Sequence, residues 1–577
     1  MPQGSLWNEQ RRPVQSRRAF AHVLHTTNGA NFETLVAIDS GEMKGMRVER
    51  LAGKVMLLWG ARRAFLAIAA GAIGVLALPP FGFFAALFVS FTLLVWLLDG
   101  AASHPESGWL GRLRPAFVTG WLFGFGYFVA GLWWLGNALM IEAVEFAWAL
   151  PFAILGLPAV LAIFYGLATA FARLFWSDGM GRIAALAAGF GLAEWLRSFV
   201  ATGFPWNAIG YGAMPFPMMM QSAHVIGLFG VTTLSVFVFA APALIGTRRG
   251  MVPGLLIAAA LFAAHLGYGA YRLTFSATVP DDTPVTIRLV QPRIDQAQKL
   301  DDAERSAIFE EHLALSRSAA EEGGERPDIV VWPETSVPFI LTQNQDALAR
   351  IAEVLEDGQI LVAGAVRAEE MGAGIPPRYY NSVYVIDDKG QIIGASDKVH
   401  LVPFGEYVPF EDILRNWGID NVVNMPGGFS PASARQMLTL PDGLKLWPLI
   451  CYEAIFPQLT GQPAEGADAI LNLTNDAWFG NSPGPYQHFH QARVRAVESG
   501  LPLIRGANSG ISTVVDSYGR VVAGLDFDKR GVLNATIARK PELFWNEHSR
   551  MRNFWLIIAG IIIVAAGARI GFISGKN

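Results

Sequence analysis

The single cysteine of the chain, Cys451, directly follows an apolar run that is typical of a buried strand. In the segment LWPLICYEAIFP, a strand-to-helix turn would present the cysteine at the end of a sheet, where a thiolate can act as a nucleophile. The alternative is a small apolar core residue, which is the commoner role of a lone cysteine. The choice between the two depends on the residues that surround it.

Two ionisable residues stand at the ends of other expected strands. Glu334, in VVWPETSVPF, lies in apolar surroundings that favour a carboxylate able to take a proton from a thiol. Lys398, in SDKVHLVPFGEYVPF, can hold Cys451 as a thiolate and stabilise an oxyanion. Taken singly, Glu334 also fits a helix N-terminus and Lys398 a solvated loop. The three residue types together, at three separate strand ends, indicate a catalytic site.

The elements that position these residues alternate strand and helix patterns. Helices are expected at 302–322, 344–356 and 485–499. Strands are expected at 285–291, 328–332, 360–366, 381–386, 446–450, 468–473, 502–506 and 511–516. This order predicts an α/β domain in which apolar strands are buried between helical layers.

Charged residues are scarce in the preceding part of the chain. Of the 577 residues only 16% are charged, against about 25% in soluble domains, and only 13 charged residues fall within 64–271. Apolar runs that can each cross a membrane, which takes about 20 residues, predict about eight transmembrane helices. They lie near 65–82, 83–98, 116–138, 147–172, 183–200, 225–246, 252–273 and 554–573. The first two are separated by a Pro- and Gly-containing break.

The Lys and Arg residues of the short loops all fall on one side of this arrangement. They are Lys54, Arg62, Arg63, Arg112, Arg114, Arg173, Arg182, Arg248 and Arg249. Because cytoplasmic loops are enriched in Lys and Arg, both termini are expected in the cytoplasm. The α/β segment is then extracytoplasmic, in the periplasm of a bacterium.

The chain is therefore expected to have four regions. Residues 1–55 form a polar cytoplasmic arm without apolar periodicity, expected to be disordered, and 56–274 form a membrane domain of seven helices. Residues 275–550 form the periplasmic catalytic domain, and 551–577 form the last transmembrane helix with a short cytoplasmic tail.

Three short motifs resemble a known family. WPE at Glu334, K-x-H-L-V-P-F-G-E from Lys398 and CYE at Cys451 resemble the Glu-Lys-Cys signature of the carbon-nitrogen hydrolase (nitrilase) superfamily, in its order over about 285–540. The membrane spans, LVPFGEYVPF and NLTNDAWFG are similar specifically to the apolipoprotein N-acyltransferase family, over nearly the whole chain. The resemblance implies a nitrilase-like α-β-β-α sandwich joined to a membrane domain.

The resemblance also implies an activity. Members of this family N-acylate the α-amino group of the N-terminal S-diacylglyceryl cysteine of apolipoproteins, the last step of bacterial lipoprotein maturation, at the inner membrane. A phospholipid, usually phosphatidylethanolamine, supplies the acyl group. By similarity Cys451 is the nucleophile that carries a thioester, Glu334 the general base and Lys398 the oxyanion stabiliser. Two-step covalent catalysis predicts ping-pong kinetics, and water must be excluded from the thioester.

Six further residues are singled out with the same resemblance in view. Glu406 matches a functional acid of the family, Tyr452 and Glu453 match the residues after its cysteine, and Glu453 is a candidate second partner for Lys398. Asn475, Trp478 and Phe479 lie in a loop where they could contact acyl chains or headgroups, with core packing as the alternative. The stretch QPRIDQAQKL departs from the family, with Arg293 and Leu300 where Asn and Trp are usual.

Other functions fit less well. A membrane-anchored amidase acting on a small C–N substrate would use the same three residues, but it would not need eight spans. A transporter is disfavoured because Glu194 and Arg197, the clearest charges inside spans, have the i, i+3 spacing of an ion pair. His488 and His490 lie two residues apart without a second cysteine, so we expect no metal and no cofactor. A near-neutral net charge of -4 predicts no nucleic-acid partner, and a monomer is the default expectation.

Overall fold

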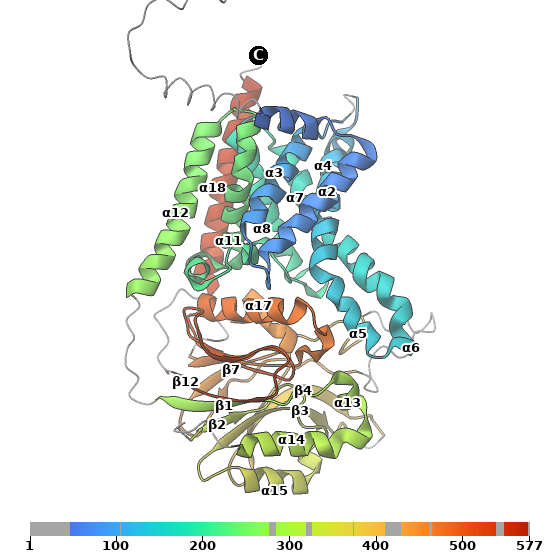
Figure 1. The fold of residues 1–577 in the computed structure, drawn as a ribbon, viewed down its shortest axis with the longest axis vertical. Helices are drawn as coiled ribbons and strands as arrows, with labels where there is room; N and C mark the ends of the chain where they lie inside the picture. Colours follow the sequence, from blue (N-terminus) through green and yellow to red (C-terminus); the bar gives the residue numbers. More distant parts are fainter. Residues whose placement is uncertain are drawn as a thin grey trace, which may run out of the picture.

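The computed structural model describes residues 47–103, 106–275, 284–318, 326–372, 374–409, 428–460, 464, 466–537 and 547–574. Helices form one part of the molecule, and two sheets with their covering helices form the other (Figure 1). Most of the expected N-terminal arm, residues 1–46, lies outside the described residues, whereas 47–56 are helical.

A helix occupies each of the apolar ranges expected to cross the membrane. The bounds are α2 Gly60–Gly74, α3 Ala85–Asp99, α4 Trp109–Leu132, α7 Leu157–Leu174, α8 Met180–Arg197, α11 Ser222–Ala240, α12 Met251–Phe275 and α18 Glu547–Ser574. The expected break between the first two is present, because α2 and its 3₁₀ extension end at Ala77 and α3 begins at Ala85.

Six helical segments of the described chain are long and apolar enough to cross a membrane. Two of the eight expected spans, α3 and α8, are not among these six, each for its own reason. Helix α3 is apolar but short, and α8 contains Arg182, Glu194 and Arg197 within its 18 residues. Glu194 and Arg197 form the expected ion pair, with Arg197 Nε donating to Glu194 at 2.9 Å.

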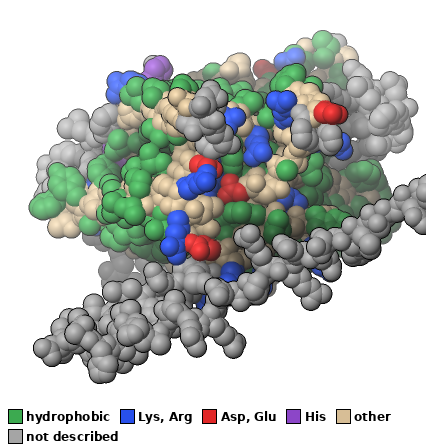
Figure 2. Space-filling model, turned by 90° about the horizontal axis from the view of Figure 1, so that it is seen from above, with side chains coloured by type: hydrophobic (Ala, Val, Ile, Leu, Met, Phe, Trp, Pro, Cys, Tyr) green, Lys and Arg blue, Asp and Glu red, His purple; other side chains and the backbone are tan. Residues whose placement is uncertain are grey.

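The short loops before α2, between α3 and α4, between α7 and α8 and before α12, which with the helix ends that flank them carry the Lys and Arg residues in question, lie at the end of the molecule remote from the sheets (Figure 1). Arg173, in the last turn of α7, donates to the carbonyl of Ala101 just after α3 (3.1 Å). Viewed from that end, Lys and Arg side chains are spread among hydrophobic ones (Figure 2). The expectation that the basic loops share one side is therefore confirmed.

The α/β part contains two six-stranded sheets. The first has the order β12-β1-β2-β3-β4-β5 and the second the order β11-β10-β9-β8-β7-β6. The first sheet consists of β1 Val285–Gln291, β2 Ile329–Val331, β3 Ile360–Glu369, β4 Arg378–Ile386, β5 Ile392–Asp397 and β12 Gly531–Ile537. The second consists of β6 Leu438–Thr439, β7 Lys445–Ile450, β8 Ala469–Thr474, β9 Leu503–Ala507, β10 Ser512–Val515 and β11 Val521–Leu525. Strands β1, β2 and β3 run parallel, as do β7, β8 and β9.

The two sheets face each other and are covered outside by helices, which gives the expected α-β-β-α order. Alternate side chains of β1 and β8, such as Ile287 and Leu471, meet in one buried cluster between the sheets, as the two-residue period of a strand requires. Helices α14 Arg305–Arg317 and α15 Gln345–Val354 cover the outer face of the first sheet. Helix α17 Gly484–Ser499 covers that of the second.

Helix α17 also joins the sheets to the membrane helices, which lie directly against it (Figure 1). The Gln487 side-chain oxygen accepts hydrogen bonds from Trp134, Trp206 and Asn207 at 3.0–3.2 Å. Gly227, with φ +63°, interrupts the helical conformation inside α11. The backbone amide of Leu228 donates instead to a Glu498 carboxylate oxygen at 2.6 Å. Because buried polar groups require partners, these bonds fix the sheets against the membrane part.

Candidate active site

Cys451 lies at the point where strand β7 turns into a short 3₁₀ helix, Cys451–Ile455. Its φ is +51°, a left-handed conformation that a non-glycine residue adopts at a cost. The side chain is 9% exposed at the sheet end. The structure thus confirms the strand-end turn expected from the sequence, and a strained backbone at this position favours a functional site.

Lys398 follows strand β5 and is fully buried. Its Nζ lies 2.9 Å from Glu406 and 3.6 Å from Oε1 of Glu334. Asn381, on strand β4, donates through Nδ2 to both carboxylates, at 2.8 Å to Glu334 and 2.9 Å to Glu406. One amide and one ammonium therefore hold the two acids together, and sequence reasoning identified the acids and the lysine but not Asn381.

The Glu334 carboxylate is also fixed from the second sheet. Its Oε2 accepts a hydrogen bond from the backbone amide of Asn475 at 2.9 Å. Asn475 in turn donates through Nδ2 to Gln296 (2.6 Å), and its Oδ1 accepts from Asn508 (3.0 Å). Asn475 thus orients the expected base through its backbone amide, and its side chain bonds to other polar side chains.

The charges around the thiol determine its resting state. Burial raises the pKa of Cys451 and the Glu334 carboxylate raises it further, outweighing the opposite effect of Lys398. Burial alone would lower the pKa of Lys398, but Glu406 and Glu334 outweigh it and raise that pKa. The lysine is therefore an ammonium and the cysteine a neutral thiol, which differs from the expectation that Lys398 holds a thiolate.

Glu453 ties the Lys398 loop to the Cys451 turn. One of its oxygens accepts from the amides of Val399 (2.9 Å) and His400 (3.0 Å), and the other accepts from Ile450 (2.8 Å). Arg435 forms an ion pair with the same carboxylate. Lys398 forms its ion pairs with Glu406 and Glu334, so Glu453 acts on the lysine mainly by positioning the backbone that follows it.

The other aromatic candidates connect the site to the membrane part. The Tyr452 hydroxyl donates to the carbonyl of Gly203 at 3.0 Å. Phe479 packs on Trp134 (4.7 Å between centroids) and Trp206 (5.6 Å), which corresponds to the core-packing alternative. Trp478 is half-buried beside it.

The segment that departs from the family lies next to the site. Lys299 donates to the carbonyls of Glu334 and Thr335 at 3.1 and 3.2 Å. Leu300 is 36% exposed at the end of the short helix Gln296–Leu300. Lys299 belongs to the stretch QPRIDQAQKL that the sequence analysis noted, but its role was not predicted.

A fully buried polar chain lies behind Cys451 and was not found from the sequence, where His488 was considered only as a metal ligand. His488 Nε2 donates to the Cys451 carbonyl at 3.1 Å, and its Nδ1 lies 2.8 Å from Asp476. Arg505 donates to the other Asp476 oxygen at 2.8 Å. This chain holds the strained turn in place. Within the described residues, no cluster of His, Cys, Asp and Glu side chains is arranged to hold a metal.

We expect Asp476→Asn to destabilise the protein in a pH-dependent way. Burial raises the pKa of Asp476, but Arg505 and His488 outweigh it and lower the pKa from 3.8 to about 2. A lowered pKa contributes stability above pH 3.8 that is lost as the pH falls toward 2, in total about 2 kcal/mol. Melting of the detergent-solubilised variant should show a deficit at neutral pH that narrows below pH 4. A deficit that stays constant down to pH 3 would contradict this assignment.

Comparison with known proteins first defines a class. The carbon-nitrogen hydrolase family matches residues 286–541, which contain both sheets and the Glu334, Lys398 and Cys451 cluster. Among solved structures, the chain is similar to Nit3 of Saccharomyces cerevisiae, a nitrilase superfamily member, with 19% identity, a TM-score of 0.34, and coverage of 45% of this chain and 91% of that one.

More specific similarity extends into the membrane part. The apolipoprotein N-acyltransferase N-terminal domain matches residues 70–241. The apolipoprotein N-acyltransferase of Rhizobium rhizogenes is 67% identical over 92% of this chain and 100% of its own length. That of Agrobacterium fabrum is 64% identical over 92% and 100%. The chain therefore belongs to the apolipoprotein N-acyltransferase family and is an acyltransferase.

Proposed function

We propose that the chain transfers an acyl group from a membrane phospholipid to the α-amino group of the N-terminal diacylglyceryl cysteine of apolipoproteins, the last step of lipoprotein maturation. The observation that carries this proposal is the position of the cluster. Tyr452, directly after the candidate nucleophile, is bonded to the membrane part at Gly203. The Cys451 thiol, next to the membrane part, is then within reach of the ester groups of lipids. A hydrolase of small amides would not require this position.

In the first half-reaction, the Cys451 sulfur attacks the ester carbonyl carbon of the phospholipid. Because the thiol is neutral at rest, the proton must leave as the bond forms, and Glu334 is the acceptor. The buried Lys398 ammonium stabilises the oxyanion. Glu334 then returns the proton to the departing alkoxide, which releases a lysophospholipid and leaves a thioester on Cys451.

In the second half-reaction, the lipoprotein amine attacks the thioester. Glu334 takes a proton from the amine, the C–S bond breaks, and the sulfur regains a proton as the amide product leaves. Water must be excluded from the site, because it would otherwise hydrolyse the thioester before the amine attacks. The packing of Phe479 on Trp134 and Trp206 supports such exclusion.

We also propose the membrane arrangement that this chemistry needs. All eight apolar helices cross the inner membrane, with residues 56–274 as the membrane domain, 275–550 as a periplasmic catalytic domain and 551–577 as the last span with a short tail. The termini then lie in the cytoplasm. The location of the basic short loops at the end remote from the sheets supports this orientation. The donor is phosphatidylethanolamine and the enzyme acts as a monomer.

The intact mass of the protein tests the acyl-enzyme directly. Purified, detergent-solubilised chain is incubated with phosphatidylethanolamine, and parallel samples receive neutral hydroxylamine or a diacylglyceryl lipopeptide. We expect a mass increase of one acyl chain, removed by hydroxylamine and transferred to the lipopeptide. Cys451→Ala, which leaves the fold with a slightly smaller buried side chain, should show no increase.

Two other results would redirect the assignment. A folded wild-type protein that gains no acyl mass but releases ammonia from small amides would support an amidase. An adduct that persists in Cys451→Ala would place the acyl group on another residue and contradict the proposed nucleophile.

A further inference from the structure

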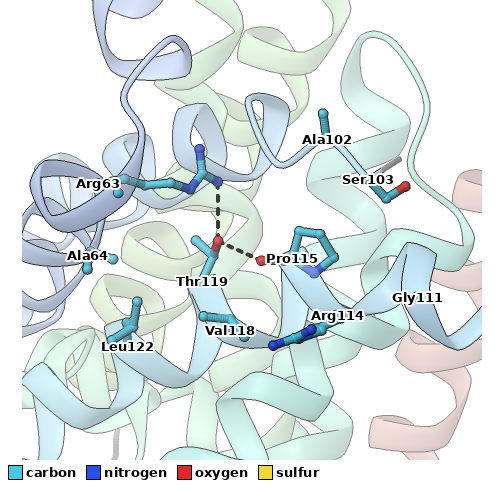
Figure 3. Close-up of a pocket in the computed structure, with 12 residues that line it drawn as sticks. Arg63, Ala64, Ala102, Ser103, Gly111, Arg114, Pro115, Val118, Thr119 and Leu122 are labelled. Atoms are coloured by element: carbon cyan, nitrogen blue, oxygen red, sulfur yellow. Dashed lines mark hydrogen bonds between the residues drawn. The ribbon is translucent and has the colours of Figure 1, made fainter. Parts of the chain in front are cut away.

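An open pocket lies in the membrane part at the end remote from the catalytic cluster. It has a volume of about 500 Å³ and is formed by the beginning of α2, the beginning of α4 and the segment after α3 (Figure 3). Small residues create the space, since Gly60, Ala64, Ala67, Ala102 and Gly111 all line it. A Cβ built on Gly60 would meet no other atom within 4 Å.

The lining changes from cationic to apolar along α4. Arg114, Val118 and Leu122 all line the pocket, and residues spaced by four lie on one face of a helix, about 6 Å apart along its axis. Arg114 lies in the first turns of the helix, whereas Val118 and Leu122 lie progressively deeper in the membrane part. The pocket therefore has a basic mouth and an apolar floor, the order of a phospholipid headgroup and its acyl chain.

The two arginines at the mouth are Arg63 and Arg114. Arg63 crosses from α2 and donates to Thr119 of α4 at 3.2 Å (Figure 3). It also donates to the carbonyl of Leu97. Among the described residues, no carboxylate forms an ion pair with Arg63 or Arg114. Three other arginines at the same end are paired with acids, namely Arg182 with Asp99, Arg248 with Glu49 and Arg249 with Asp178, whereas Arg112 and Arg173 donate to backbone carbonyls. Charge that is left uncompensated beside a hollow indicates an anionic ligand.

We propose that this pocket binds the phosphate-bearing headgroup of an anionic phospholipid, with one acyl chain against Val118 and Leu122. Arg63 and Arg114 contact the phosphate. The lipid belongs to the leaflet opposite the catalytic cluster, so it is distinct from the acyl donor that Cys451 consumes. The site does not depend on the proposed reaction, because no residue of the catalytic cluster lines it.

Lipid binding by the full-length chain tests the proposal. Delipidated protein in detergent is titrated with phosphatidylglycerol or phosphatidylcholine, and bound lipid is counted by native mass spectrometry. We expect the anionic lipid to bind more tightly, and the pair Arg63→Ala/Arg114→Ala to weaken it by about fivefold per arginine. The matched control is Arg62→Ala/Arg112→Ala, which removes the same charge from neighbouring exposed positions outside the pocket.

Two single variants keep the test informative if loss of Arg63 disturbs folding. Arg114→Glu reverses an exposed charge and should weaken the binding of phosphatidylglycerol more than Arg114→Ala does. Val118→Trp should fill the floor of the pocket. Val160→Trp places the same side chain on a comparably exposed position of α7 that does not line the pocket (56% exposed, against 42% for Val118) and should have no effect.

The outcomes separate a lipid from a free anion. If Val118→Trp weakens the binding of phosphatidylglycerol but not of inorganic phosphate, the result supports a lipid site, because only the lipid has an acyl chain that contacts the floor. Equal binding of the two phospholipids, equal losses in the pocket and control arginine pairs, or competition by inorganic phosphate at the affinity of the lipid would each overturn the proposal.

Discussion

Glu334→Gln is expected to slow formation of the acyl-enzyme by about 10²–10⁴-fold, the range for loss of a general base. The reason lies in the resting state of the nucleophile. Burial and Glu334 itself raise the pKa of Cys451, so almost no thiolate is present at neutral pH. Without Glu334, the thiol proton has no acceptor. A time course of intact mass with phosphatidylethanolamine measures this step separately from acyl transfer to the amine.

The pH dependence of the same variant separates a base from a structural carboxylate. Its residual reaction must use the small thiolate fraction, which grows about tenfold per pH unit below the thiol pKa. The rate of Glu334→Gln should therefore rise steeply with pH, whereas the wild-type rate should rise less. Glu353→Gln, an exposed position on α15, serves as the control. Parallel pH profiles for wild type and Glu334→Gln would argue against the base role.

Motif recognition located the reacting groups but could not find the groups that fix them. Glu334, Lys398 and Cys451 stand in short recognisable motifs, and Glu334 and Cys451 also follow apolar strands that the sequence makes visible. The strand before Lys398, β5, was not predicted, so the lysine was located by its motif alone. Asn381 looks like any polar residue within a strand, and only the pairing of β4 with β3 and β5 places its amide between two acids. His488 likewise becomes meaningful only once α17 packs behind the Cys451 turn.

The fold was predictable where burial is complete and less so where it is partial. All the expected strands are present, and strands such as β1 and β8 are buried on both faces, so most of their residues are apolar. The sequence did not predict β5, β6, β11 and β12; β11 is largely exposed and β6 has only two residues. Such segments become strands because they pair with a neighbouring strand, and this pairing does not require an apolar sequence.

The second large effect is expected for Lys398→Met, in both half-reactions. The raised pKa of Lys398 keeps it cationic, so its role is electrostatic and applies to each oxyanion. Losing such a stabiliser costs about 10²–10³-fold in rate. The same change also leaves Glu334 and Glu406 buried without their cation, and breaking a buried pair in this way destabilises proteins by about 3–5 kcal/mol. Loss of activity alone would therefore not separate catalysis from folding.

The double variant Lys398→Met/Glu406→Gln separates the two effects. Removing one carboxylate together with the ammonium restores the charge balance around Glu334, since Asn381 can still donate to both side chains. We expect the Tm to recover part of the loss seen in Lys398→Met, while acyl-enzyme formation and its discharge to a lipopeptide both stay slow. If the rates recovered together with the Tm, Lys398 would be needed only to neutralise its buried neighbours, and the oxyanion would have to be stabilised by another group.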